Sequence, residues 1–166
     1  MRLIKLTALS FLLFAFVLNI TSCERDGERK KASVEYLKSA IPMTGAQENN
    51  PANVSTALGS LDVYYAKSSK TLSYKFTWNG LTDTIIGIHI HGLAPVGYNA
   101  GIIQNILVLN TKNEAMFPYR GGSYSGTFLV DGALVKEENL LNGLYYLNIH
   151  TKTYPGGEIR GQIKFQ

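Results

Sequence analysis

Cysteine and histidine are scarce in this chain. Cys23 is the only cysteine among 166 residues, and there are three histidines. Because one cysteine cannot form a disulfide within the chain, the folded part must be stabilised by a hydrophobic core. The histidines are also unevenly placed, since all three lie in two short apolar segments.

Clustered positive charge is absent from most of the chain. The formal net charge is +4, and lysine and arginine are spread along the sequence apart from the run 29–31. Nucleic-acid-binding domains carry a basic patch or stripe, which cannot be found here. We therefore expect no nucleic-acid partner, and we interpret the basic run as part of a solvated linker rather than a contact with anionic lipid.

The motifs of common enzyme classes are missing as well. The glycines separate apolar runs and do not form a phosphate-binding loop. Ser123 and Ser125 lie in GGSYSG, which no helical segment follows, so a nucleophile elbow is not indicated. No nucleophile, base and orienting group come together in the pattern. The sequence thus gives no positive indication of an enzyme and no catalytic residue.

One long apolar run occurs, at the N-terminus, and it ends at Cys23. Arg2 and Lys5 precede the run LTALSFLLFAFVLNI, and the polar segment ERDGERKKAS follows the cysteine. This order is typical of a secretory signal. A transmembrane helix is the alternative, but a run of about 15 residues is short for a span of about 20.

The residues ITSC at the end of that run resemble a bacterial lipoprotein signal, in which the cysteine is lipidated and becomes the new N-terminus. The resemblance implies a signal peptide at residues 1–22, lipid on Cys23, a polar tether at 23–33 and a domain at 34–166. We accordingly expect an extracytoplasmic protein that is anchored by lipid to a bacterial membrane, at the outer membrane or the cell surface.

Short β-type segments separated by turn residues fill the chain from about Val34. In TLSYKFTWNGL every second residue from Leu72 to Trp78 is apolar, and the pair Asn-Gly ends the segment. Similar runs are TALGSLDVYYA, TIIGIHIHGL, IIQNILVL, GSYSGTFLV, GLYYLNIHT and EIRGQIKFQ. This pattern predicts an all-β fold, an antiparallel sandwich or barrel of about 7–9 short strands. The one helical candidate lies within GALVKEENLLNG.

The histidines lie on the polar side of two of these segments. In IIGIHIHG, alternation places His89 and His91 on one face and the isoleucines Ile86, Ile88 and Ile90 on the other. In GLYYLNIHT, His150 shares a face with Tyr146 and Asn148, opposite three apolar residues. We therefore predict that all three imidazoles lie outside the apolar core.

A hairpin centred near Tyr154 joins the last two segments. Its register predicts the pairs His150 with Glu158, Asn148 with Arg160, and Tyr146 with Gln162. We therefore interpret Glu158, Arg160 and Asn148 as structural residues or as supports for the histidines. If Arg160 is structural, it should hydrogen-bond carbonyls or a carboxylate near the His-Ile-His strand and hold the loop after Gly92 in place. The alternative is that Arg160 steers an anionic ligand to a metal.

The segments GIHIHGLAPVGYNAGIIQNIL and LNGLYYLNIHTKTYPGGEIRGQI together resemble the CHRD domain, which is named from chordin. MTGAQENNP is similar to the opening strand and Gly-Ala-Gln-Glu segment of that family. The resemblance covers about Ala40 to Phe165 and departs at GYNAG, where relatives often carry glycine and proline. It implies a β-rich binding or structural module of unsettled molecular function. The partner, a protein or a small ligand, is not identified by it.

The alternative function is a mononuclear metal site. Two histidines at i and i+2 on a strand can reach one ion, and a third from another strand leaves an open fourth position, as in catalytic zinc or copper sites. His89, His91 and His150 are the candidate ligands for one copper or zinc ion, with redox chemistry open to copper, and Glu158 could orient a ring. A distant likeness to copper/zinc superoxide dismutases does not extend to two metals, because no further histidine exists. The competing hypothesis is that the rings only hydrogen-bond loop backbone groups.

Overall fold

Eight antiparallel strands make up most of the regular structure. The computed structural model describes residues 35–49, 53–106 and 120–166. The strands are β1 (Glu35–Thr44), β2 (Leu58–Ala66), β3 (Thr71–Asn79), β4 (Ile85–Gly92), β5 (Ile102–Asn105), β6 (Gly121–Leu129), β7 (Tyr145–Thr151) and β8 (Ile159–Ile163). A 3-10 turn η1 (Gly45–Gln47) and a short helix α2 (Glu137–Leu141) complete the set. The predicted all-β class and strand number are therefore confirmed. Cys23 and its signal-like segment lie outside the described residues.

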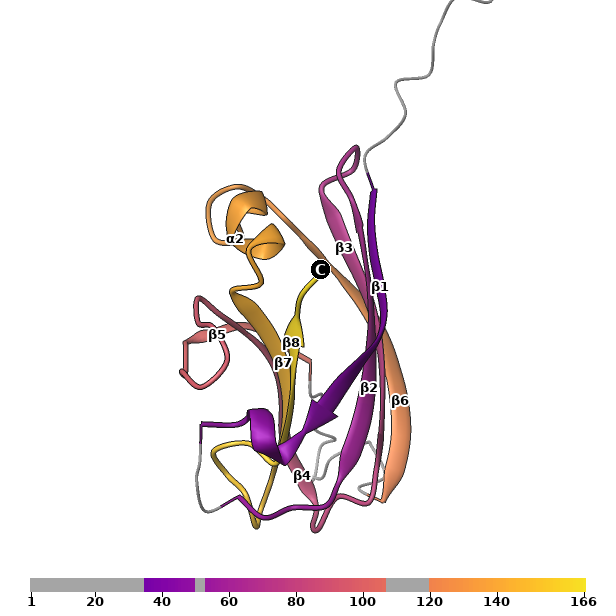
Figure 1. The fold of residues 1–166 in the computed structure, drawn as a ribbon, viewed down its shortest axis with the longest axis vertical. Helices are drawn as coiled ribbons and strands as arrows, with labels where there is room; N and C mark the ends of the chain where they lie inside the picture. The colour runs from indigo at the N-terminus through magenta and orange to yellow at the C-terminus, as the bar shows by residue number, and fades with distance from the viewer. Residues whose placement is uncertain (1–34, 50–52, 107–119) are drawn as a thin grey trace, which may run out of the picture. The chain divides into compact units, whose positions relative to one another are not determined.

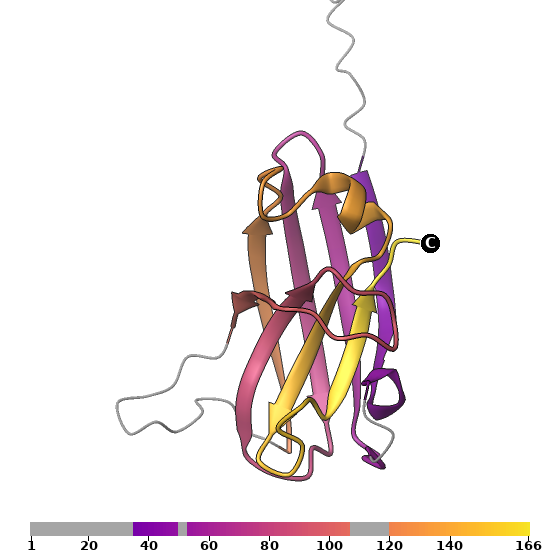
Figure 2. The ribbon, with the colours of Figure 1, turned by 90° about the vertical axis from the view of Figure 1, so that its left-hand side faces the viewer.

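The strands form one antiparallel sheet that curls into two layers. Their order is β5-β4-β7-β8-β1-β2-β3-β6, and Figures 1 and 2 show β4, β7 and β8 facing β1, β2, β3 and β6. Strand β1 connects the layers, because it pairs with β2 along its length and with β8 through Thr44 and Arg160. Its pairing with β2 is interrupted between Lys38 and Ile41. Such an irregularity bends a strand, which suits β1 at the corner of the sheet.

The inward faces of the two layers form the apolar core. The predicted alternation in β3 is confirmed, since Leu72, Tyr74, Phe76 and Trp78 are all buried. From the opposite layer come the buried side chains Ile88, Ile90, Tyr145, Leu147, Ile149, Ile159 and Ile163. Burial of this much apolar and aromatic surface is the main stabilising contribution in a chain without disulfides.

One residue that the alternation assigned to the core is on the surface. Ile86 is 43 % exposed, whereas Ile85 is 1 % exposed. The pairing of β4 with β7 is irregular between Ile85 and Gly87, so the inward and outward faces change places there. The prediction for Ile86 is therefore wrong, while Ile88 and Ile90 are buried as expected.

The predicted helix is α2, which covers one end of the sandwich (Figure 1). Leu140 packs into the core, and Glu137 accepts a hydrogen bond from the Tyr65 hydroxyl at 2.7 Å. No helix among the described residues has the length and apolar character needed to cross a bilayer.

Strands β7 and β8 are buried on both faces, which is unusual for an antiparallel sandwich. All five residues of β8 are buried, including Arg160 and Gln162 on the outward face. The loop 93–101 covers this face, and Figure 2 shows it crossing in front of the strands on its way to β5. The outward side chains of β7 and β8 thus lie in an interior, and each polar group there needs a partner.

Candidate metal centre

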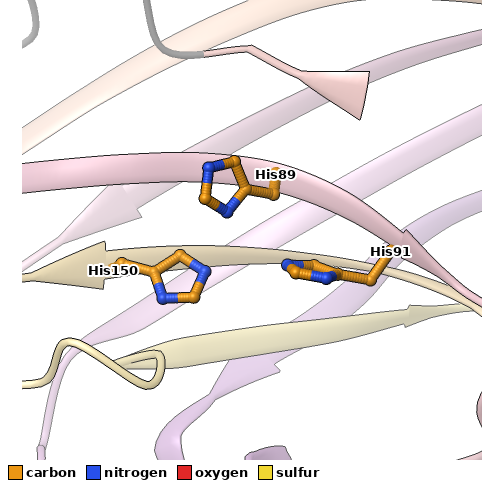
Figure 3. Close-up of side chains that lie close together, drawn as sticks. All are labelled: His89, His91 and His150. Carbon is orange, nitrogen blue, oxygen red and sulfur yellow. The ribbon is translucent and has the colours of Figure 1, made fainter. Parts of the chain in front are cut away.

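The pairing of β4 with β7 brings the three histidines together. His89 lies opposite Asn148, His91 opposite Tyr146, and Gly87 opposite His150. All three imidazoles are consequently on the outward face, as the alternation predicted, and one ring nitrogen from each lies within 4.8 Å of the others. Figure 3 shows the rings pointing toward a common centre, two from β4 and one from β7.

Backbone carbonyls fix two of the rings. Nδ1 of His91 is 2.9 Å from the Ala100 carbonyl oxygen, and Nδ1 of His150 is 2.9 Å from the Pro155 carbonyl oxygen. A carbonyl only accepts, so Nδ1 carries the hydrogen in each ring and Nε2 carries the free lone pair. This is the arrangement by which proteins orient histidines that bind metals. The hypothesis that the rings hydrogen-bond to loop backbone therefore accounts for one nitrogen of His91 and one nitrogen of His150.

The remaining nitrogens have no protein partner. His89 Nδ1, His91 Nε2 and His150 Nε2 are buried and make no hydrogen bond with the described residues. In Figure 3 these three atoms face one another across the gap between the rings. Two acceptors, His91 Nε2 and His150 Nε2, thus converge with a third ring nitrogen whose hydrogen no protein partner fixes.

Burial keeps these imidazoles neutral. Desolvation, followed by the nearby rings of His150 and His91, lowers the pKa of His89 to about 4. Desolvation is also the main cause that lowers the pKa of His91 and of His150. At neutral pH all three rings therefore have lone pairs available, and neutral imidazole is the form that binds metals.

The spacing of the rings is close to that of a bound ion. With metal–nitrogen bonds of about 2.0–2.1 Å, two ligand atoms lie roughly 3.3–4.2 Å apart. The observed limit of 4.8 Å therefore requires small side-chain rotations and no movement of the strands. Gly87 leaves room for them, because a Cβ there would lie 2.8 Å from His89 Cε1 and 3.3 Å from His150 Cδ2.

Arg160 attaches the covering loop to the sheet. Its guanidinium donates to the carbonyls of Tyr98 at 2.8 Å and Pro95 at 2.9 Å, and to Gln162 Oε1 at 2.6 Å. Gln162 in turn donates to the carbonyl of Ala94. The predicted structural role of Arg160 toward the loop after Gly92 is thus what the structure shows. With the side chain 0 % exposed, its charge does not face an incoming anion.

An aromatic ring lies between Arg160 and the histidines. The Arg160 guanidinium carbon is 3.5 Å from the centre of the Tyr146 ring. The same ring stacks on His91, with centroids 4.9 Å apart and planes 9° apart. The Tyr146 hydroxyl accepts a hydrogen bond from the Ala100 amide, so loop, tyrosine and ligand ring hold one another in position.

Glu158 does not orient His150, and that prediction is wrong. The buried carboxylate accepts hydrogen bonds from Ser55 Oγ, from the amide and hydroxyl of Thr82, and from Thr151 Oγ1 at 2.7–3.1 Å. The regular pairing of β7 with β8 ends at Ile149 and Ile159, so alternation no longer applies to Glu158. Its role is to fasten two loops to the end of β7. The predicted pairs of Asn148 with Arg160 and of Tyr146 with Gln162 lie within the regular pairing and are confirmed.

The family model for the CHRD domain matches residues 40–163, which include every residue of this site. The chain belongs to the CHRD family. No curated protein and no solved structure matches it. Family membership supports a binding or structural module, and the three-histidine cluster is a specific feature of this CHRD domain that such a module could use.

Glu48 belongs to the site of this CHRD domain, although no pattern in the sequence pointed to it. The residue follows η1, is 8 % exposed, and packs so closely on Gly157 that a Cβ there would collide with its carboxylate. Desolvation raises the pKa of Glu48 to about 7, opposed by a hydrogen bond from Asn148 and by the charge of Arg160. The only available signal was its place in the GAQE segment, which is far from Asn148 in the sequence.

The unsatisfied polar atoms of the domain are concentrated here. Among the described residues, the buried side-chain atoms without a partner are His89 Nδ1, His91 Nε2, His150 Nε2, Asn148 Oδ1, Glu48 Oε1 and Arg160 Nε. Buried polar atoms in native proteins are nearly always paired, and exceptions call for a bound water or ion. All six are at or beside the histidine cluster.

Proposed function

We propose that this CHRD domain binds a single copper or zinc ion through His89 Nδ1, His91 Nε2 and His150 Nε2. The observation that supports the proposal is the convergence of three buried, unpartnered ring nitrogens within 4.8 Å. Imidazole suits copper and zinc, and three nitrogen ligands leave a fourth position open to solvent or a small ligand.

A single metal ion can satisfy all three ring nitrogens at once. The Nδ1 hydrogens of His91 and His150 are committed to carbonyls, so their Nε2 atoms can only accept. His89 Nδ1 makes a third atom that faces the same point. One cation can bind three lone pairs at this point, whereas a water molecule satisfies all three nitrogens only when His89 carries its hydrogen on Nδ1 and donates it to the water. Leaving such groups buried and unpaired would cost about 1–3 kcal/mol each.

We further propose that the domain is tethered to a bacterial membrane by lipid on Cys23, in an extracytoplasmic location. The charged start, the apolar run and the cysteine at its end support this proposal. In such a protein the histidine site would be exposed to metals of the cell envelope rather than the cytoplasm.

The experiment is a metal titration of the full-length chain carrying Cys23→Ser, which removes the only thiol. The protein is stripped with a chelator and titrated with Zn(II) and with Cu(II), and bound metal is counted by elemental analysis. We expect one ion per chain. His89→Ala, His91→Ala and His150→Ala should each weaken binding by more than the roughly 10–100-fold loss typical of supporting residues.

Lys152→Ala is the matched control, because its exposed side chain lies two residues from His150. It should bind metal like the parent chain. If the parent chain retains no stoichiometric metal, or if the histidine variants bind as it does, the metal proposal is wrong. The domain would then be a binding or structural module in which the imidazoles serve only the loops.

A further inference from the structure

Asn148 lies beside the three histidines of the proposed metal site. On β7 it lies directly opposite His89 and two residues from His150. Its side chain is on the same outward face as the three rings and is 2 % exposed. The Asn148 side chain is within hydrogen-bonding reach of the His91 imidazole. Because the hydrogen of neutral His91 is on Nδ1, Asn148 Oδ1 receives no hydrogen bond from the described residues. A buried carbonyl oxygen therefore lies beside the His91 imidazole in the histidine cluster, and it too requires a donor.

The amide end of Asn148 is occupied by Glu48. A hydrogen bond joins the two side chains, with the carboxylate accepting from the amide. This hydrogen bond lowers the pKa of Glu48, as a bond from the NH₂ group to the carboxylate does, so the Oδ1 end of Asn148 is directed away from Glu48. The Oδ1 atom is left for the side of the histidines.

We propose that Asn148 Oδ1 accepts a hydrogen bond from a water molecule in the fourth coordination position, and that Glu48 is the positioning residue that holds Asn148 in that orientation. This inference rests on the proposed metal site. It adds a selectivity, since a ligand with hydrogen on its donor atom, such as water or hydroxide, would be favoured. An anion without hydrogen, such as azide, would place a lone pair against Oδ1 and would bind less well.

Azide binding to the Cu(II)-loaded full-length Cys23→Ser chain tests the inference, with the bound anion followed by its absorption band. Azide must displace the water that Asn148 holds. Asn148→Leu, which keeps the size and removes the acceptor, should therefore raise azide affinity about tenfold, the equivalent of one hydrogen bond of about 1–1.5 kcal/mol. A residue that only maintained the structure would lower ligand and metal affinity or leave them unchanged.

Glu48 variants separate positioning from simple charge repulsion. Glu48→Leu should also raise azide affinity, whereas Glu48→Gln should stay near the parent value, because its carbonyl oxygen can still accept from the Asn148 amide. In the Asn148→Leu background Glu48→Leu should have no further effect, since it acts through Asn148. If charge alone mattered, Glu48→Gln would match Glu48→Leu and the two substitutions would be additive.

Lys152→Ala, the exposed control of the metal titration, should leave azide affinity unchanged. If Asn148→Leu fails to fold, the difference in azide affinity between Glu48→Leu and Glu48→Gln decides the test. Unchanged or weakened azide binding in metal-loaded Asn148→Leu or Glu48→Leu overturns the inference alone. Failure of the parent chain to hold Cu(II) at all overturns the proposed metal site and this inference with it.

Discussion

Replacing Arg160 by methionine would remove the attachment between the covering loop and the sheet. The guanidinium holds two loop carbonyls, those of Pro95 and Tyr98, from a fully buried position. Methionine preserves much of the side-chain volume and packing on Tyr146 but donates no hydrogen bond. The substitution therefore tests the hydrogen bonds rather than the filling of space.

The expected loss in free energy of unfolding depends on whether the acceptors that Arg160 leaves behind can find new partners. Gln162 Oε1 loses its donor as well, and each of the three acceptors would cost about 1–3 kcal/mol if it stayed buried and unpaired. The loop can turn its carbonyls toward water, and removal of a buried charge returns part of its desolvation cost, so the lower end applies. We expect the free energy of unfolding to fall by about 2–3 kcal/mol. Arg160→Lys should recover only part of this, because one ammonium cannot reproduce the fork of the guanidinium.

Urea unfolding of the full-length metal-free chain measures the global effect, and amide hydrogen exchange locates it. The amides of Ala94 and Ala100, which bond to Leu144 and Tyr146, should exchange faster in Arg160→Met, while β2 and β3 follow global stability. Lys75→Met removes an exposed charge on β3 and should change stability by no more than about 0.5 kcal/mol. A loss below about 1 kcal/mol with unchanged exchange in the loop would refute the reasoning.

Three further predictions concern the histidines and the anchor. The pKa of His89 is lowered to about 4 in the folded state, so as pH falls His89 is protonated first in the unfolded state. The urea midpoint of the metal-free chain should therefore drop between pH 6.5 and 4, and it should drop less in His89→Ala. An equal drop in the parent chain and in His89→Ala would contradict this prediction. Gly87→Ala should weaken metal binding by at least about tenfold with little change in melting temperature, since the added Cβ meets movable ring atoms; Gly156→Ala, where the space is open, is the control. Cys23→Ser should leave the membrane fraction, and unchanged fractionation would show that no lipid is attached there.

Alternation predicted the parts of the fold where strand pairing is continuous. In β3 and β7 every second residue faces the core, and counting outward from Tyr154 gave the observed pairs of Asn148 and Tyr146 with β8. The same rule placed the histidines on the outward face. A period of two needs no knowledge of distant contacts, which is why a single sequence was sufficient for these features.

The failures occur where pairing is interrupted. Ile86 lies at an irregularity in β4, and Glu158 lies before the first regular pair of β8. At both positions the phase of alternation changes, so the side chain turns to the opposite side or to the end of the sheet. Glu48 was missed for another reason, because a contact between η1 and the outward face of β7 leaves no periodic trace in the sequence.

The burial of polar side chains on the outward face distinguishes structural from ligand-binding groups. Gln162 is satisfied there by Arg160 and by the carbonyls of Ala94 and Gly143, as expected of residues that hold a loop in place. The histidines share the same cover and sheet, and loop carbonyls satisfy one nitrogen in His91 and in His150. A purely structural cluster would pair the remaining nitrogens as well, since unpaired buried groups are costly. Their convergence on one another indicates that the sheet and loop maintain a site whose last partner comes from outside the chain.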